Sequence, residues 1–155
     1  MIHPAINEVG IRNDVSFGID VKIVEPVNLY GCSIDDGVFI GPFVEIQKDT
    51  SVGKRTRVQS HTFICELVSI GDDCFIGHGV MFINDLFEEG APAQGNKQLW
   101  KPTRISNNVS IGSNATILPI NICSNVVIGA GAVVTKDITS AGVYVGNPAK
   151  KIKDI

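Results

Sequence analysis

Large apolar residues recur at every sixth position between Ile34 and Phe82. Four positions after each of them up to Ile76 stands a small or β-branched residue, most often Val or Thr. If about a third of residues are large and apolar, nine matches in nine arise by chance with a probability of about 10⁻⁴ to 10⁻⁵. The segment is therefore an internal repeat. Its large positions are Ile34, Ile40, Ile46, Val52, Val58, Ile64, Ile70, Ile76 and Phe82.

A period of six fits neither the 3.6-residue spacing of an amphipathic helix nor the alternation of a simple strand. It fits a short strand followed by a bend, with one large and one small side chain per unit pointing inward. Val, Ile and Thr favour strands, while Gly, Asp and Asn favour bends. A single unit cannot bury its apolar residue, so the units must wind into stacked coils. The pattern predicts an all-β parallel solenoid with three units per coil, in which stacked residues lie about 4.7–4.9 Å apart.

Two steps in the repeat are five residues long instead of six. They run from Leu29 to Ile34 and from Ile117 to Ile122, and each predicts a corner that is one residue short. The chain before Leu29 keeps the period loosely, and no linker or low-complexity segment interrupts it. We therefore expect one domain that spans residues 1–155.

The repeat stops after Phe82 and resumes at Ile105, which predicts one extended loop at about 84–103. A long excursion inside a compact repeat is usually functional, and this one holds the single Trp of the chain. The basic segment at about 143–155 also leaves the repeat. We expect it to form a strand followed by a short helical or irregular tail.

Composition narrows the setting in which the protein works. The formal net charge of −3 gives no reason to expect nucleic acid or an anionic membrane as a partner. No signal-like segment and no apolar run of membrane-spanning length stands out, so we expect a cytoplasmic protein. The four cysteines form no Cys-x-x-Cys pair, and Cys74 occupies a small inward position of the repeat. Packing explains Cys74 better than a disulfide or a metal.

The units Ile-Gly-x-x-Ala-x at 111–116 and 128–133, and the closing Val145-Gly-Asn-Pro-Ala149, resemble the hexapeptide-repeat acyltransferases. The resemblance covers nearly the whole chain and implies a left-handed parallel β-helix. Handedness follows from the resemblance alone, because crossover sterics normally favour the right-handed turn. The resemblance also implies a homotrimer that binds acetyl-coenzyme A between adjacent subunits. One departure is Ile120, where the family usually has Gly after Leu-Pro, and it leaves the shape of that corner open.

A narrower motif, Gly77-His-Gly-Val-Met-Phe-Ile-Asn-Asp85, is similar to that of nucleotide-sugar N-acetyltransferases. The similarity implies an acetyl-CoA-dependent N-acetyltransferase that acts on the 3-amino group of a dTDP- or UDP-linked deoxyamino sugar. Such products enter cell-surface glycans, including lipopolysaccharide. Two alternatives stay open: another acceptor, such as a 4-amino sugar, a serine or a small alcohol, and a non-catalytic solenoid scaffold. A scaffold would explain neither the loop nor the basic tail.

Candidate acceptor-binding residues stand where the repeat breaks. Acetyl transfer to an amine needs an oriented neutral amine, a donor to the developing oxyanion and an exit for the proton. We hypothesise that Asp85 accepts a hydrogen bond from the amine and takes its proton, and that Asn84 holds the amine or the sugar. Glu66, eighteen residues before Asn84, should stack beside it and bind a sugar hydroxyl. Alternatively, Asn84 and Asp85 are a turn pair that only begins the loop.

His78 is a second candidate for the substrate site. Its imidazole could act as general base near neutral pH, or it could be a surface or interface residue. It precedes Asn84 by six residues, which is one side of the triangular coil. Zinc chemistry would need three converging imidazoles, usually with one close pair. The spacing of His3, His61 and His78 provides no such pair, so we expect no metal.

Candidate residues for coenzyme A lie in the last coils and the tail. Small side chains let a ligand approach the backbone, and lysines beside a rigid proline could meet phosphates. Tight bends alone would also explain the glycines. On the loop, Trp100 and Phe87 could stack on a nucleotide base or pack against a neighbouring subunit. The predicted cofactor residues are Gly112, Ser113, Ala130, Lys136, Asn147, Pro148, Lys150 and Lys151.

Overall fold

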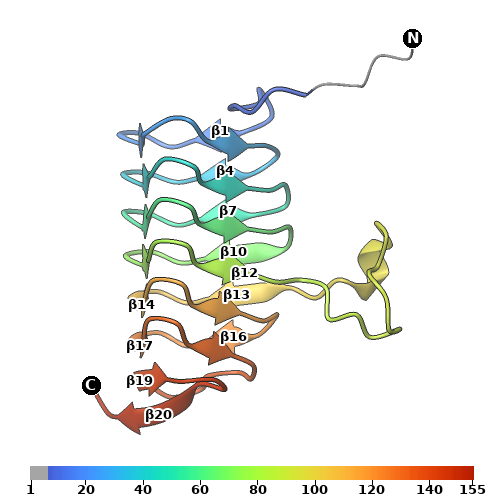
Figure 1. The fold of residues 1–155 in the computed structure, drawn as a ribbon. Coiled ribbons are helices and arrows are strands. Elements are labelled where there is room, and N and C mark those ends of the chain that lie inside the picture. The colour runs from blue at the N-terminus through green and yellow to red at the C-terminus, as the bar shows by residue number, and fades with distance from the viewer. Residues whose placement is uncertain (1–6) are drawn as a thin grey trace.

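The computed structural model describes residues 7–155, which form a stack of parallel coils with three flat sides (Figure 1). The fold is the left-handed β-helix that the family resemblance implies. His3 lies outside the described residues. Face 1 consists of β1 (Ser16–Phe17), β4 (Ser33–Ile34), β7 (Ser51–Val52), β10 (Val68–Ile70), β13 (Thr103–Ile105) and β16 (Asn121–Ile122).

The other two faces follow face 1 in every coil. Face 2 consists of β2 (Lys22–Ile23), β5 (Phe39–Ile40), β8 (Arg57–Val58), β11 (Phe75–Ile76), β14 (Val109–Ile111), β17 (Val126–Ile128), β19 (Gly142–Val145) and β20 (Lys150–Lys153). Face 3 consists of β3 (Asn28–Leu29), β6 (Glu45–Ile46), β9 (Phe63–Ile64), β12 (Met81–Phe82), β15 (Thr116–Ile117) and β18 (Val133–Val134). The short strands fit the six-residue unit, because the rest of each unit is the corner.

Strand register confirms the predicted coil lengths. Ser33 pairs with Ser51, eighteen residues further on. Ser16 pairs with Ser33, and Arg104 pairs with Asn121, each after seventeen residues. The two five-residue steps in the sequence are therefore shortened corners, as expected. Each shortened corner moves the stacking partners of the following strands by one residue.

The interior contains the side chains that the repeat predicts. From Ile34 to Phe82, the large positions are at most 3% exposed. The small positions that alternate with them are at most 4% exposed, and Cys74 is among them. Burying a large aliphatic side chain contributes about 1.5–3 kcal/mol, so the column of large residues is the main source of stability.

Threonines in the interior are satisfied by the backbone of the next coil. Thr50, Thr56 and Thr62 donate their hydroxyls to the carbonyl oxygens of Cys65, Gly71 and Gly77, at 3.0, 2.8 and 2.9 Å. A buried hydroxyl without a partner would be costly. These bonds therefore let Thr replace Val at inward positions while tying neighbouring coils together.

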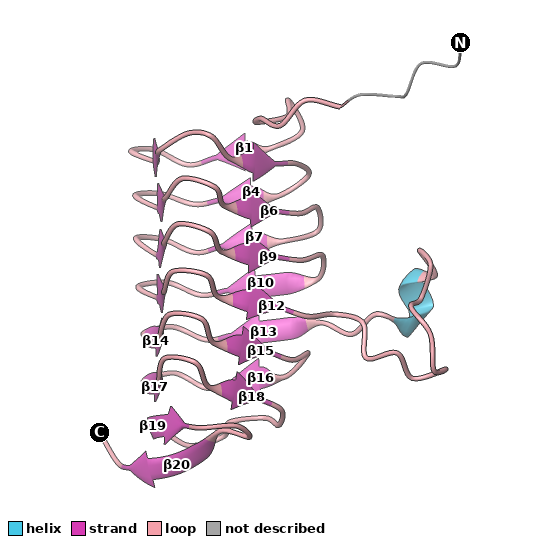
Figure 2. Ribbon diagram, viewed as in Figure 1, coloured by secondary structure: helices cyan, strands magenta, loops and turns pink. Residues whose placement is uncertain are grey.

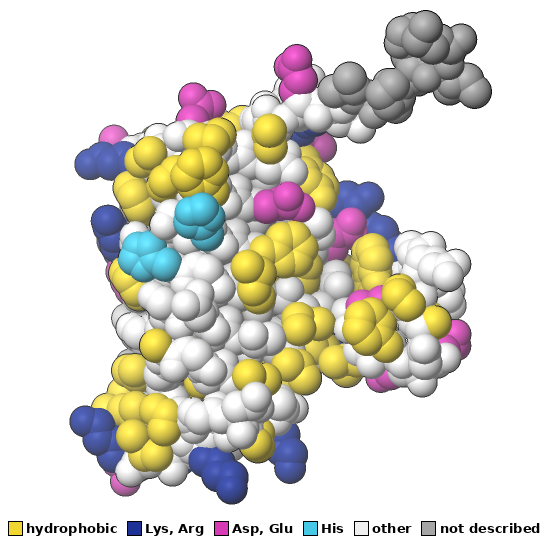
Figure 3. Space-filling view, viewed as in Figure 1, with side chains coloured by type: hydrophobic (Ala, Val, Ile, Leu, Met, Phe, Trp, Pro, Cys, Tyr) yellow, Lys and Arg dark blue, Asp and Glu magenta, His cyan; other side chains and the backbone are white. Residues whose placement is uncertain are grey.

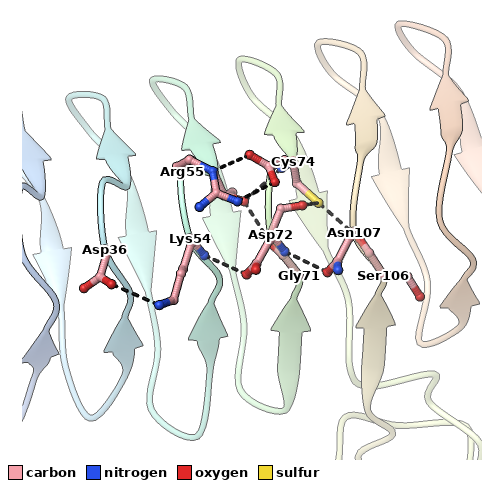
Figure 4. Close-up of polar contacts among 10 residues, drawn as sticks. Asp36, Lys54, Arg55, Gly71, Asp72, Cys74, Ser106 and Asn107 are labelled. Carbon is pink, nitrogen blue, oxygen red and sulfur yellow. Dashed lines mark hydrogen bonds and ion pairs between the residues drawn. The ribbon is translucent and has the colours of Figure 1, made fainter.

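Polar side chains join successive coils along the corner between faces 1 and 2 (Figure 4). The backbone N–H of Lys54 donates to Asp72 Oδ1 at 2.8 Å, and that of Asp72 donates to Asn107 Oδ1 at 2.9 Å. Asp36 accepts from the N–H of Ile19 at 3.0 Å and pairs with Lys54 Nζ at 3.1 Å. These contacts, led by the Ile19 amide, lower the pKa of Asp36. The ladder satisfies corner amides that no strand pairing reaches.

The excursion between β12 and β13 projects sideways from the stack (Figure 2). Ser69 pairs with Arg104, thirty-five residues later, so two coils stack normally across it. The excursion contains one short 3-10 helix, η1 (Lys97–Leu99). In the part of the chain that the structure describes, no helix is long and apolar enough to cross a membrane.

The tail differs from the expectation in one respect. β19 stacks in parallel on β17, as a strand of the tail should. The segment after it is neither helical nor irregular, because β20 turns back and pairs antiparallel with β19. An open strand edge invites such pairing, so β20 covers the C-terminal end of face 2.

Replacing Thr56 by Val should destabilise the protein by about 1–3 kcal/mol, the cost of an unpaired buried polar group. Thr56 Oγ1 also accepts from the backbone N–H of Cys74 at 3.0 Å, and Val removes that acceptor. Thr62→Val is the matched control, because it removes only a donor to a carbonyl. Urea unfolding measures both variants. Equal losses in the two would contradict this role of Thr56.

The buried thiols should be unreactive in the native protein. Burial raises the pKa of Cys32 to about 11 and that of Cys65 to about 12, and burial also raises the pKa of Cys74. Because the thiolate is the reactive form, a disulfide reagent at pH 8 should titrate at most the partly exposed Cys123. All four thiols should react in denaturant. Rapid native reaction of two or more would contradict this packing.

Candidate functional site

Face 3 and its two edges hold most of the predicted site residues. The histidine edge is the corner between faces 2 and 3. Ile76 pairs with Ile111, and Ile111 pairs with Ile128. Residues two positions later therefore share a column, which consists of His78, Ser113 and Ala130. This confirms that Ser113 and Ala130 stack, and it adds His78 to them.

The loop edge is the corner between faces 3 and 1, from which the excursion leaves. Phe82 pairs with Ile117, and Ile117 pairs with Val134. Two residues further along the chain, the column on this edge consists of Asn84, Pro119 and Lys136. The predicted stacking of Asn84 on Glu66 is confirmed, because Asn84 Nδ2 donates to the Glu66 carbonyl oxygen at 3.2 Å.

A cavity of about 300 Å³ opens where the excursion meets face 3. Its lining is mostly apolar and includes aromatic rings, with a few polar side chains among them, so it could hold a ligand with a planar part. The structure thus brings Trp100 and Phe87 together with Asn84 and Asp85. The lining residues are Gln47, Phe63, Cys65, Phe82, Ile83, Asn84, Asp85, Phe87 and Trp100.

Asp85 organises the excursion. Its Oδ1 accepts from the backbone N–H of Phe87 at 3.0 Å, and its Oδ2 accepts from that of Ala93 at 2.7 Å. The backbone N–H of Lys101 donates to the Asn84 carbonyl at 2.9 Å and closes the neck of the loop. The explanation of this pair as loop-forming residues therefore has direct support. A carboxylate has about four lone-pair positions, so Asp85 can still accept from a substrate, and its catalytic role stays a prediction.

Glu66 lies beneath the excursion, with 9% of its side chain exposed. Its Oε2 is 2.7 Å from Lys97 Nζ, although the approach lacks hydrogen-bond geometry. Lys48 Nζ is 3.9 Å from its Oε1. The Glu66 carboxylate raises the pKa of Lys97. In the structure, Glu66 thus contacts the excursion through Lys97. Its contact with a sugar hydroxyl stays a prediction.

His78 is exposed on the histidine edge and does not meet Asn84, which lies across face 3. Two histidine side chains lie next to each other on this surface (Figure 3). The ring of His61 stacks on Phe43, with 4.8 Å between centroids, so His61 has a packing role. Within residues 7–155, no three metal-ligating side chains converge.

Gly112 has a structural explanation that needs no ligand. A Cβ at this position would lie 2.5 Å from the backbone nitrogen of Ala130 in the next coil. The close stacking of the coils therefore requires glycine here, whether or not a ligand binds. A ligand on the histidine edge would meet the backbone here, but the glycine does not prove one.

The turn between β19 and β20 extends face 3 at its C-terminal end. The N–H of Val133 donates to the Gly146 carbonyl at 3.0 Å, and that of Ala149 donates to the Val133 carbonyl at 2.8 Å. Asn147 and Pro148 lie between these two contacts and thus beside β18. The turn is therefore on the same side of the molecule as the loop cavity.

The two predicted tail lysines have different surroundings. Lys136, Pro148 and Lys150 line one cavity of about 200 Å³. Adjacent residues of a strand point to opposite sides, and Lys151 instead pairs with Asp154 at 2.6 Å. Lys150 and Lys151 belong to strand β20 and point to opposite sides, and their contacts with the phosphates of coenzyme A stay a prediction.

Three site residues escaped the sequence analysis. Phe63 and Gln47 line the loop cavity, and Lys97 reaches Glu66 from the excursion. Phe63 carried only a weak signal, since Phe39 and Phe75 stand at the same outward position of the repeat. Lys97 carried none, because the repeat does not predict how the loop folds.

The comparisons with known proteins agree with this architecture. The model for the "hexapeptide repeat of succinyl-transferase" matches residues 67–81 and 102–136. These two segments are similar to hexapeptide repeats. The matched segments flank the excursion, so the repeat is recognised on both sides of the loop.

Relatives and solved structures extend the match over most of the chain. The bifunctional protein GlmU of Thermosipho melanesiensis is 32% identical over 108 residues, which are 70% of this chain and 20% of that protein. The chain spans between 17 and 28% of the length of the curated relatives it matches. A point mutant of AntD, an N-acyltransferase from Bacillus cereus solved with dTDP and coenzyme A, has a TM-score of 0.77 at 23% identity, covering 90% of this chain and 82% of AntD. A maltose O-acetyltransferase from Clostridium difficile has a TM-score of 0.57 at 28% identity, covering 90% and 69%.

Replacing Asp85 by Ala should open the excursion to proteolysis. The variant loses both acceptors for the N–H groups of Phe87 and Ala93, so the loop samples unfolded conformations more often. We expect trypsin to cleave after Lys97 about tenfold faster than in the wild-type chain, as for the loss of about 1.4 kcal/mol of local stability. Mass spectrometry of timed digests measures this. An unchanged rate would show that Asp85 does not hold the loop.

Proposed function

We propose that the protein transfers the acetyl group of acetyl-coenzyme A to an amino group of a nucleotide-linked sugar, on face 3. The observation that carries the proposal is the loop cavity, which is lined by Asn84 and Asp85 together with Phe87 and Trp100. Polar side chains suit an amino sugar, and aromatic rings suit a nucleobase. A non-catalytic scaffold needs no such cavity.

The acceptor that we propose is the 3-amino group of a dTDP- or UDP-linked deoxyamino sugar used in cell-surface glycan. AntD supports this choice, because it shares the fold and was solved with dTDP and coenzyme A. We also propose that the enzyme works in the cytoplasm, where nucleotide-sugar acceptors and acetyl-coenzyme A would both be supplied.

Acetyl-coenzyme A would lie along face 3. Its phosphates would meet Lys136 and Lys150 at the C-terminal cavity, and Asn147 and Pro148 would border that end. Lys136 lies two coils from Asn84 on the loop edge, or about 9–10 Å. The thioester could then approach the loop cavity, while Gly112, Ser113 and Ala130 leave the histidine edge open to a chain near the backbone.

The reaction is an addition followed by an elimination. The neutral amine attacks the thioester carbonyl carbon, the carbon–sulfur bond breaks, and coenzyme A leaves as the thiol. Asp85 would orient the amine, accept its proton and pass it to the departing sulfur, and Asn84 would hold the amine or the sugar. Positioning supplies much of the rate, because a bound amine has a high effective molarity.

We propose that the site is completed by a second subunit in a homotrimer. His78 lies across face 3 from Asn84 and cannot reach the loop cavity of its own chain. It is exposed, so a neighbouring subunit's loop could meet it. In that arrangement His78 serves as base or binds substrate at the boundary between subunits.

A second candidate is O-acetylation of a sugar hydroxyl. The maltose O-acetyltransferase favours it, because at 28% its sequence identity exceeds that of AntD. A hydroxyl is a weaker nucleophile than an amine and needs a general base more strongly.

Release of the coenzyme A thiol tests the proposal directly. The panel contains dTDP- and UDP-linked sugars with a 3-amino or a 4-amino group, together with maltose, each with acetyl-coenzyme A. We expect release with a 3-amino nucleotide sugar. Release only with maltose would favour O-acetylation, the second candidate. Failure to bind coenzyme A at all would contradict acetyl transfer.

Asp85→Asn is the matched variant in this assay. It keeps the shape of the side chain and one acceptor for the loop, but it cannot take a proton. The rate constant kcat should fall by about 10²–10⁴-fold if Asp85 is the base. Full activity in a variant with an intact loop would remove Asp85 from the catalytic role.

Lys150→Ala should raise KM for acetyl-coenzyme A by about tenfold, the effect expected for losing a hydrogen bond to a charged phosphate. Lys151→Ala is the control, because Lys151 pairs with Asp154 instead of lining the cavity. Steady-state kinetics with varied acetyl-coenzyme A measures both. A larger effect at Lys151 than at Lys150 would contradict the proposed phosphate site.

A further inference from the structure

One lysine of the excursion reaches back to the solenoid. Lys97 Nζ is 2.7 Å from Glu66 Oε2 and 3.4 Å from Asp49 Oδ2, and both carboxylates belong to the loop edge. Glu66 is the more buried of the two, with 9% of its side chain exposed against 59% for Asp49. An ion pair with a buried partner is less screened by solvent than a surface pair. The contact with Glu66 is therefore the one that fixes the loop.

The short helix η1 connects Lys97 rigidly to Trp100. Asn96 caps the helix by accepting from the N–H of Gln98 at 3.3 Å. The N–H of Trp100 donates to the Lys97 carbonyl at 3.3 Å, and the Lys97 ammonium lies 6.0 Å from the centre of the Trp100 ring. An ammonium at this distance is attracted to the face of the indole. Because Lys97 and Trp100 are joined in this way, the contact of Lys97 with Glu66 also fixes the position of the indole.

Trp100 forms a wall of the loop cavity that also contains Asn84 and Asp85. The neck of the loop is fixed separately, because the backbone N–H of Lys101 donates to the Asn84 carbonyl oxygen. Lys97 and Glu66 thus make a second attachment on the far side of Trp100. With the loop held at both points, the indole has one position relative to Asn84 and Asp85.

We propose that Glu66 and Lys97 form a latch that positions Trp100 as a stacking platform for the base of the nucleotide-linked acceptor. This inference rests on the proposed function. Glu66 and Lys97 are positioning residues, because they act through Trp100 and need not touch the acceptor. Opening the latch leaves the buried Glu66 carboxylate with only Lys48, 3.9 Å away. A largely buried carboxylate that loses its cation is costly, which favours the closed loop.

The single tryptophan of the chain makes the latch directly measurable. The fluorescence of Trp100, and its quenching by acrylamide, report the position of the loop without any substrate. Lys97→Met and Glu66→Gln remove the charges with little change in shape. Glu88→Gln is the matched control, because Glu88 pairs within the loop with Lys101, at 3.5 Å, instead of with the solenoid.

We expect acrylamide quenching of Trp100 to rise about twofold in Lys97→Met and in Glu66→Gln, as for a loop that opens locally, and to stay unchanged in Glu88→Gln. Quenching in the double variant should not exceed that in either single variant, since each single substitution removes the same contact. Circular dichroism confirms that each variant is folded. Quenching equal to the wild-type chain in folded Lys97→Met would overturn the latch.

Kinetics separates the latch from the proposed function. With an active nucleotide sugar, the latch variants should raise its KM about tenfold and leave KM for acetyl-coenzyme A unchanged. Equal increases in both KM values would overturn the positioning role of Trp100. If no sugar is acetylated, the proposed function fails while the quenching experiment still decides whether the latch exists.

Discussion

Parallel hydrogen bonding between successive coils is the constraint on which the whole molecule depends. It fixes which residues stack, and the inward pairs of large and small side chains keep each coil at the same width. Once Ile76 pairs with Ile111 and Phe82 pairs with Ile117, the corner residues of both edges have no freedom of register. A site that spreads over several coils can therefore be assembled from residues far apart in sequence.

The excursion exploits this regularity. Two coils stack normally across it, so the loop leaves and rejoins the solenoid without disturbing the core. Its own structure depends on a few polar contacts: the Asp85 carboxylate inside the loop, the Asn84 carbonyl at its neck and the Lys97 ion pair with Glu66. A rigid scaffold with one loosely anchored loop is an arrangement well suited to enclosing a ligand.

The sequence predicted the solenoid well because its signal is one-dimensional. The repeat specified the inward residues, the shortened corners and the stacking of Asn84 on Glu66 and of Ser113 on Ala130. It could not predict contacts made by segments outside the repeat. The fold of the excursion, the reach of Lys97 and the antiparallel return of β20 depend on tertiary contacts without periodicity. For the same reason, the sequence did not predict that Lys150 and Lys151 belong to a strand, which directs them to opposite sides.

The central claim is that both substrates bind on face 3 and its edges. Hydrogen–deuterium exchange with coenzyme A, alone and together with dTDP, tests it over the whole chain in one measurement. We predict slower exchange at the histidine edge, at the loop edge and excursion, and at the turn between β19 and β20, with face 1 unchanged. Protection confined to face 1, or none at either edge of face 3, would contradict the account.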